Sequence, residues 1–249
     1  MKERGIIFSA PMVRAILDGR KTQTRRLAKP QPPHSCRYVM NGAGSHALCL
    51  GPNDECVPPT SKSIDHRLPC PYGVPGDRLW VRERWGWFDQ FVQHDAPPTG
   101  PIVYGTDGVP AGSHGTYWRP SIHMPRWASR ITLEVVDVRV ERLNEISAKD
   151  AVREGLERHD DHPTSITWRH YGDEEPPDPI DLWEGWLNPI NSFRTLWDSI
   201  NGKRHPWSSN PWVWVIEFRK VEAHDVSWPS AGSNVRSPTI DRFAREVLA

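Results

Sequence analysis

The chain has 249 residues, and its 31 Lys and Arg residues balance 31 Asp and Glu residues, so that its formal net charge is zero. This balance argues against a protein that coats nucleic acid by bulk charge, and the length suits one domain with large insertions or two small ones. No apolar run approaches the roughly 20 residues of a membrane span, and the N-terminus lacks the pattern of a secretory signal. We therefore expect a cytoplasmic protein that does not contact a membrane.

The beginning of the chain predicts a strand, a helix and a cationic turn. Residues 6–8 are apolar, Ser9 and Pro11 are typical of a helix start, and Gly19 is placed to end that helix. Residues 19–26 read GRKTQTRR and contain no acid. Residues 1–30 hold eight cations against two acids. We expect one basic face that suits an anionic or nucleotide-like ligand.

The next segment, residues 28–75, is rich in Pro, Gly and Ser and predicts an irregular insertion. All four cysteines fall within it, together with three histidines: Cys36, Cys49, Cys56, Cys70, His34, His46 and His66. A zinc site and free thiols in a long loop are both compatible with this composition. The spacing is not C-x-x-C, which favours thiols. We therefore expect neither a metal nor a cofactor.

Residues 79–85 predict a strand on which Leu79, Val81, Glu83 and Trp85 share a face. Glu83 is the one acid on that face. It could serve a site, or it could pair with an arginine such as Arg84 or Arg130, and pairing is favoured because buried carboxylates are usually paired. A second insertion covers about residues 89–125.

Residues 129–143 predict a long strand with a bulge, because the apolar alternation changes phase at Val135–Val136. A short helix follows, capped by Ser147 and ended by Gly155. We expect a buried stripe on that helix, formed by Ala148, Ala151 and Val152. Glu154 falls in its last turn, where the helix dipole disfavours an acid.

A third insertion, residues 157–187, precedes a helix that begins after Asn188 and ends at Gly202. Its expected core residues are Phe193, Leu196, Trp197 and Ile200. Residues 210–221 predict an apolar, central strand, whose Trp212 and Trp214 we also place in the core. Residues 227–249 read as a linker and a tail helix. These elements predict an α+β fold, a small β-barrel with short helices and long loop insertions.

Four positions, Gly19, Lys21, Thr24 and Arg26, match the Gly-x-Lys-x-x-(Glu or Thr)-x-Arg signature of the ASCH family. The segments GDRLWVRE, DAVREG and NPWVWVIEF extend the match. The chain thus resembles ASCH proteins of phages and prophages, and the resemblance implies a PUA-like barrel over residues 1–226 with the three insertions outside its compact core.

The threonine form of the signature resembles small bacterial amidohydrolases that remove the acetyl group from N4-acetylcytidine. Their proposed Lys, Thr and Glu triad corresponds here to Lys21, Thr24 and Glu154. The implied partner is a modified cytidine, as nucleoside, base or RNA. We expect its binding residues to be the following: Arg20, Arg26, Glu83, Trp85 and Trp87.

The implied chemistry needs a neutral lysine, because an ammonium cannot take the threonine proton. Neighbouring arginines and burial both lower a lysine pKa. On a regular strand, residues 21 and 24 would point to opposite faces, so the chain must turn at Lys21–Thr22 for them to meet. Two alternatives remain open. One is a PUA-like RNA-binding module or ribonuclease, and the other is a phage structural protein with an inert pocket.

Overall fold

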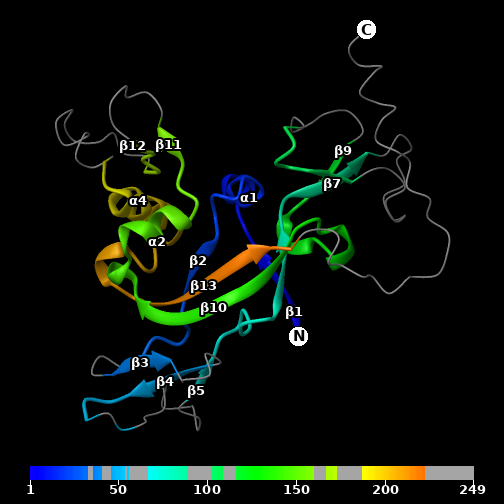
Figure 1. Cartoon of the computed structure of the whole chain (residues 1–249). Coiled ribbons are helices and arrows are strands. Elements are labelled where there is room, and N and C mark those ends of the chain that lie inside the picture. The colour runs from blue at the N-terminus through cyan, green and yellow to red at the C-terminus, as the bar shows by residue number, and fades with distance from the viewer. Residues whose placement is uncertain are drawn as a thin grey trace.

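The computed structural model describes residues 1–32, 36–40, 46–53, 55, 67–88, 102–108, 116–159, 167–172 and 187–221. Within these residues the fold is α+β, with three α-helices and four β-sheets (Figure 1). The linker and tail helix predicted for 227–249 lie outside the described residues. No helix in the described part is long and apolar enough to span a membrane.

A five-stranded sheet forms the centre of the fold, in the order β1-β6-β10-β13-β2. β1 and β6 are parallel, and the other neighbours are antiparallel. The strands are β1 (Glu3–Ile7), β6 (Arg78–Arg82), β10 (Thr132–Arg142), β13 (Trp212–Lys220) and β2 (Gln23–Leu27). β13 has a neighbour on each side, as its apolar sequence predicts. In the described residues, β1 and β2 are the edges of the sheet and do not close it into a barrel.

The predicted bulge lies in β10, where the register with β13 shifts between Val135 and Asp137. An extra residue on one strand increases its bend and twist. Figure 1 shows β10 and β13 curving together below the helices. This curvature brings the C-terminal end of β10 beneath the helices that are described next.

In the part of the chain that the structure describes, three α-helices accompany the sheet: α1 (Ala10–Leu17), α2 (Ala148–Arg153) and α4 (Pro189–Asn201). Asn188 caps α4 by accepting a hydrogen bond from the Ile190 amide at 2.9 Å. The prediction for Ile200 was wrong, because this side chain is 64% exposed in the last turn of the helix. The other three residues of α4 that were predicted to be core are buried: Phe193, Leu196 and Trp197. Trp212 and Trp214 of β13 are also buried, as predicted.

Helix α2 is shorter than the expected buried stripe requires. It has six residues, and only Ala151 is buried, whereas Ala148 and Val152 are exposed. Ala148 and Val152 are four residues apart and lie on the same side of the helix, and both are exposed, so this side does not face the core. The helix therefore contributes its C-terminal end, rather than a packed face, to the molecule.

The first insertion contains a sheet that its sequence does not predict. Three antiparallel strands form it: β3 (Arg37–Met40), β4 (His46–Leu50) and β5 (Arg67–Pro69). Tyr38, Ala47 and Leu68 are buried on the side of this sheet that packs on the main core. The strands are too short to show an alternation that is distinct from loop sequence.

The expected strand 79–85 is interrupted. β6 ends at Arg82, and Trp85 begins β7 (Trp85–Phe88), which pairs with two short strands of the second insertion. These are β8 (Ile102–Tyr104) and β9 (Thr116–Arg119). Figure 1 shows β7 and β9 on the opposite side of α1 from α2 and α4. In the third insertion, β11 (Arg158–His159) pairs with β12 (Thr167–Trp168).

Candidate functional site

The end of α1 places Lys21. Gly19 has φ of 75°, the left-handed conformation that a glycine adopts without a Cβ penalty, and it ends the helix as predicted. The Lys21 amide then donates to the Ala15 carbonyl at 2.9 Å, and the Thr22 amide donates to the Arg153 carbonyl at 3.0 Å. The chain thus passes from α1 across the end of α2 before β2 begins at Gln23.

The end of α2 places Glu154 opposite Lys21. Ser147 caps the helix by accepting a hydrogen bond from the Asp150 amide at 3.1 Å. Glu154 is the C-cap residue, and Gly155 follows with φ of 86°. A Cβ on Gly155 would lie 2.7 Å from the Lys21 Cβ and 2.9 Å from the Ala15 Cβ. Glycine therefore permits both the turn and the close approach of α1 to α2.

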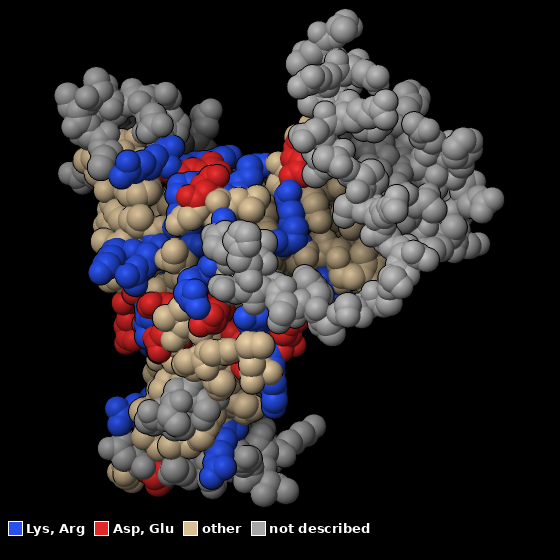
Figure 2. All heavy atoms as spheres, turned by 45° about the vertical axis from the view of Figure 1, so that its right-hand side comes forward, with Lys and Arg blue, Asp and Glu red and all other residues tan. Residues whose placement is uncertain are grey.

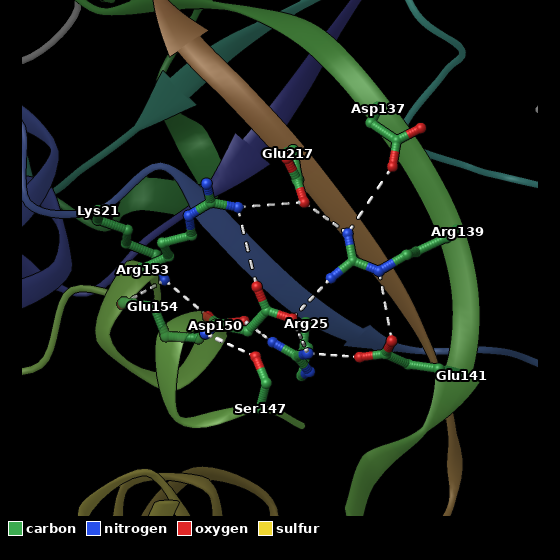
Figure 3. A network of polar contacts seen from close by, with 10 residues as sticks. All are labelled: Lys21, Arg25, Asp137, Arg139, Glu141, Ser147, Asp150, Arg153, Glu154 and Glu217. Carbon is green, nitrogen blue, oxygen red and sulfur yellow. Dashed lines mark hydrogen bonds and ion pairs between the residues drawn. The ribbon is translucent and has the colours of Figure 1, made fainter. Parts of the chain in front are cut away.

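Lys21 and Glu154 form a buried ion pair, as Figure 3 shows. The Lys21 Nζ donates to the Glu154 carbonyl at 2.7 Å and to its Oε2 at 2.9 Å. The side chains are 3% and 4% exposed. Two of the three predicted triad residues are therefore in direct contact. Phe8 borders the pair, with its ring centroid 5.7 Å from Nζ.

Burial lowers the pKa of Lys21 from its usual value of 10.5, and the charges of Arg26 and Arg25 act in the same direction. The Glu154 carboxylate raises the pKa through its charge and its hydrogen bond, without cancelling the effect of burial. The direction of this shift is the one that a lysine base requires.

Arg25 holds the other oxygen of Glu154. Its Nη1 donates to Glu154 Oε1 at 3.1 Å, and its Nη2 donates to Glu141 and lies 3.6 Å from Asp150 Oδ2. The Arg25 side chain is 1% exposed and lies over the Phe193 ring at 5.8 Å. The sequence suggested only a cation that repels Lys21. The structure shows that Arg25 also fixes the carboxylate that Lys21 contacts.

A second arginine, Arg139, extends this network (Figure 3), and its side chain is partly exposed. Arg139 contacts Asp150 at 3.0 Å, Glu217 at 2.6 Å and Glu141 at 3.3 Å. Arg153 contacts Glu217 at 3.6 Å. The network therefore joins α2 to strands β2, β10 and β13. Neither Arg139 nor Arg153 makes an ion pair with Glu154.

Thr24, the third predicted triad residue, is buried in β2, where it pairs with Ile216 of β13. It lies on the same face of the strand as Arg26. Arg26 and Lys21 both lie over the Phe8 ring, at 5.0 Å and 5.7 Å. The expected turn at Lys21–Thr22 is not found: the turn of the chain lies at residues 18–19, and Lys21 makes an isolated bridge with Glu154 just before the strand begins. Among the described residues, no hydrogen bond joins Thr24 to Lys21 or Glu154.

The cations of residues 19–26 are individually engaged with carbonyl and carboxylate oxygens. Arg20 donates to the carbonyls of Gly155 and Leu156, both at 3.3 Å, and contacts Asp18 at 2.9 Å. Arg26 donates to the Ile7 carbonyl at 2.6 Å. Figure 2 shows basic and acidic side chains interspersed on one face of the molecule.

Glu83 pairs with Arg130, which is one of its two predicted partners. The Arg130 Nε and Nη2 donate to the carboxylate at 3.1 Å and 3.2 Å, and Thr106 donates at 2.8 Å. Glu83 is 2% exposed. The guanidinium of Arg84, the other candidate partner, lies over the Trp118 ring at 4.8 Å. Glu83 thus joins β6 and β7 to the second insertion.

Trp85 and Trp87 are buried in a second hydrophobic cluster with Met124 and Ala128. Trp87 also stacks on Tyr117, with ring centroids 5.9 Å apart. The structure does not bring these two tryptophans to the Lys21–Glu154 pair, because β7 leaves the central sheet to pair with β8 and β9. The expectation that they line the same pocket as Lys21 is therefore not supported.

The cysteine segment provides no metal centre in the described part of the chain, which contains no group of three His, Cys, Asp or Glu side chains able to hold an ion. Cys36, Cys49 and Cys70 are buried. Burial raises the pKa of the Cys70 thiol to about 11, which disfavours the thiolate that a metal requires. Cys56, His34 and His66 lie outside the described residues.

The sequence-based interpretation gave two residues of β2 no place in the site beyond the charge of Arg25. They are Arg25, described above, and Gln23, which is fully buried. The period-two alternation of a strand places both on one face, and that signal was available in the sequence. Comparison of the chain with protein-family models, with curated proteins and with solved structures found no match. An assignment of function therefore depends on the residues of this chain and their geometry.

Proposed function

We propose that the chain is an amidohydrolase that cleaves the acyl amide of N4-acylcytidine or a related nucleoside or base, and that its central sheet is the core of a PUA-like barrel. The single observation that supports this proposal most strongly is the buried contact of 2.9 Å between Lys21 and Glu154. The resemblance of residues 19–26 to the ASCH signature supplies the substrate class.

Lys21 is the general base in this proposal. A neutral amine has two hydrogens and one lone pair. The Glu154 carbonyl and Oε2 accept two hydrogen bonds from Nζ, at 2.7 Å and 2.9 Å. When Lys21 is neutral, both of its hydrogens are thus used, and its lone pair is left to take a proton. Glu154 orients the base. Since its two carboxylate oxygens contact Lys21 and Arg25, it is not the group that protonates the product.

Thr24 is the nucleophile. Its hydroxyl proton moves to Lys21, and its oxygen attacks the acyl carbon of the substrate. The bond between the acyl carbon and N4 then breaks, and Lys21 returns the proton to N4, which leaves as the amino group of cytosine. Water hydrolyses the acyl-threonine and releases the carboxylic acid. Lys21 and Thr24 are each 4% exposed, so that substrate reaches them through a local opening of the structure.

The test is incubation of the purified chain with N4-acetylcytidine, with separation of the products by chromatography. The proposal predicts equal amounts of free cytidine and acetate, formed in proportion to protein concentration. Protein denatured by heat serves as the control. If no cytidine is released over a broad range of pH and protein concentration, the proposed function is wrong.

A second candidate is nucleotide or RNA binding without turnover. It is favoured by two exposed arginines next to β7, which lie over aromatic rings and make no ion pair within the described residues. Arg84 lies 4.8 Å from the Trp118 ring, and Arg119 lies 5.0 Å from the Trp87 ring. Such pairs can bind phosphates and stacked bases. Saturable RNA binding that is weakened by Arg84→Ala and Arg119→Ala, without release of cytidine from N4-acetylcytidine, would favour this alternative.

A further inference from the structure

Arg26 is a partly buried cation that pairs with no carboxylate in the described part of the chain. Its Nη2 donates to the Ile7 carbonyl at 2.6 Å, and its Nε is buried without a hydrogen-bond partner among the described residues. Burial lowers the pKa of its guanidinium from the usual value, although the charges of Tyr72 and Glu154 raise it. A buried charge is costly unless an anion or hydrogen bonds compensate it. The described residues thus leave the charge of Arg26 only partly compensated.

The position of Arg26 connects it to the proposed nucleophile and base. Arg26 follows Thr24 by two residues in β2, so that strand alternation places both side chains on the same face, about 7 Å apart at the backbone. The guanidinium of Arg26 and the Nζ of Lys21 both lie over the Phe8 ring, at 5.0 Å and 5.7 Å. The charge of Arg26 also acts on the pKa of Lys21. A substrate that contacts Lys21 and Thr24 is therefore within reach of the long Arg26 side chain.

The reaction proposed for Thr24 creates the kind of charge that Arg26 can compensate. Attack on the acyl carbon turns the carbonyl oxygen into an oxyanion, and N–H donors that are already in place stabilise that charge. Hydrolysis of the acyl-threonine then releases a carboxylate, and a guanidinium can donate to both of its oxygens. The Nε–H of Arg26, which lacks a partner in the described residues, is one such donor.

We propose that Arg26 is the anion-binding residue of the site, which holds the acyl oxygen as it becomes negative and then the carboxylate of the released acid. The sequence placed Arg26 among the expected binding residues without naming the group that it binds. The reaction step rests on the proposed function, whereas anion binding by Arg26 does not. The absence of a paired carboxylate in the described residues fits this role, because such a carboxylate would neutralise the cation and compete with the substrate.

The electrons balance without a change in the charge of Arg26. When the Thr24 oxygen bonds to the acyl carbon, the π electrons of the carbonyl move to its oxygen, next to the guanidinium. They form the carbonyl again when the bond to N4 breaks. Arg26 keeps all of its protons, because arginine stays charged. Its effect on the rate is therefore electrostatic, and it differs from the proton transfer proposed for Lys21.

The test compares Arg26→Met with Arg82→Met. Arg82 is a matched control, because its Nε is also buried without a partner in the described residues and its guanidinium also lies over a ring, that of Trp80 at 4.4 Å. Its Nη1 donates to the Ile122 carbonyl at 3.3 Å, in the second insertion. For each protein, kcat and KM are measured on N4-acetylcytidine, together with the inhibition constant of sodium acetate. Thermal unfolding shows which variants are folded.

We expect Arg26→Met to lower kcat by about a hundredfold or more, and to weaken inhibition by acetate at least tenfold. KM should change less than kcat, because the charge on the acyl oxygen develops only in the transition state. Arg82→Met should keep kcat and the inhibition constant near those of wild type. Should Arg26→Met not fold, Arg26→Gln replaces it, because glutamine is neutral and keeps an N–H donor.

Acetate binding distinguishes a failure of this proposal from a failure of the proposed function. If wild type hydrolyses N4-acetylcytidine, a fall in kcat or in acetate inhibition of less than tenfold in the folded Arg26 variant overturns the role of Arg26 alone, as does an equal fall in Arg82→Met. If wild type is inactive, the proposed function is wrong, and calorimetric titration with sodium acetate tests Arg26. Binding that the Arg26 variant weakens tenfold or more, and Arg82→Met does not, supports the anion site. No saturable binding by wild type, or equal binding by wild type and the Arg26 variant, overturns it.

Discussion

Lys21 and Glu154 are joined through both their main chains and their side chains. They form an isolated antiparallel bridge, and the Lys21 Nζ donates to the Glu154 carbonyl at 2.7 Å and to its Oε2 at 2.9 Å. Because the end of α1 and the end of α2 meet at this point, the backbone fixes the distance between the proposed base and its carboxylate. A change in either helix end should therefore affect the site.

Gly155→Ala tests this dependence on the helix ends. The added Cβ would lie 2.7 Å from the Lys21 Cβ at a residue with φ of 86°. Strain at positive φ together with overpacking should destabilise the protein by about 2–4 kcal/mol. Gly19→Ala is the control, since its φ is 75° and nothing lies within 4 Å of the added Cβ. That substitution should cost about 1 kcal/mol. Equal losses of unfolding free energy in urea would show that the contact with Lys21 does not matter.

The pH dependence of stability tests the state of Lys21. Its pKa in the folded protein is lowered from 10.5, chiefly by burial, so that the unfolded chain binds this proton more readily. Stability should therefore rise with pH between the lowered pKa and 10.5. Lys21→Met removes this contribution. The check is the difference in unfolding free energy between wild type and Lys21→Met across that range. A difference that does not change with pH contradicts the lowered pKa.

Arg25→Met should raise the pKa of Lys21, because a nearby positive charge is lost and Glu154 is left with Lys21 as its cation. The charged groups next to Lys21 are Glu154, Arg25 and Arg26. If Lys21 is the base, the hydrolysis rate rises with pH as Lys21 loses its proton. In Arg25→Met this rise should occur at higher pH. Removing the cation from three carboxylates should also cost about 3–5 kcal/mol. Arg25→Lys keeps the charge, so that it should lower the pKa of Lys21 as Arg25 does.

Arg139→Met is the matched control for Arg25→Met. Arg139 shares Glu141 and Asp150 with Arg25 but makes no ion pair with Glu154. It should destabilise the protein without moving the pH profile. If the two variants shift the profile equally, the network has a general effect on stability, and Arg25 has no specific effect on Lys21.

Local sequence signals predicted a large part of the fold. Residue types that are common at helix ends predicted where the helices begin and end: Ser9, Ser147 and Asn188 are N-cap residues, and Gly19 follows the end of α1. The phase change at Val135–Val136 predicted the bulge in β10. The small sheets were missed. Their strands have two to five residues, and their pairing depends on partners across long loops, which a local pattern cannot show.

The sequence predicted some residues of the candidate site and missed others. The resemblance identified Lys21 and Glu154, which the structure brings together, and Thr24, which it places on the adjoining strand. The role of Arg25 was missed, because its partners Glu141 and Glu154 are more than 100 residues away in the chain. Trp85 was expected next to the site, since the sequence does not show that β6 ends at Arg82.

The most direct test of the central claim is the initial rate of cytidine release from N4-acetylcytidine by wild type and by Lys21→Arg. Arginine keeps the positive charge but cannot act as a base, because it stays protonated. If Lys21 is the general base that activates Thr24, wild type should release cytidine, and Lys21→Arg should be as inactive as Thr24→Ala. Hydrolysis by folded Lys21→Arg at a rate near that of wild type would contradict the account, since the cluster would then only hold an anion.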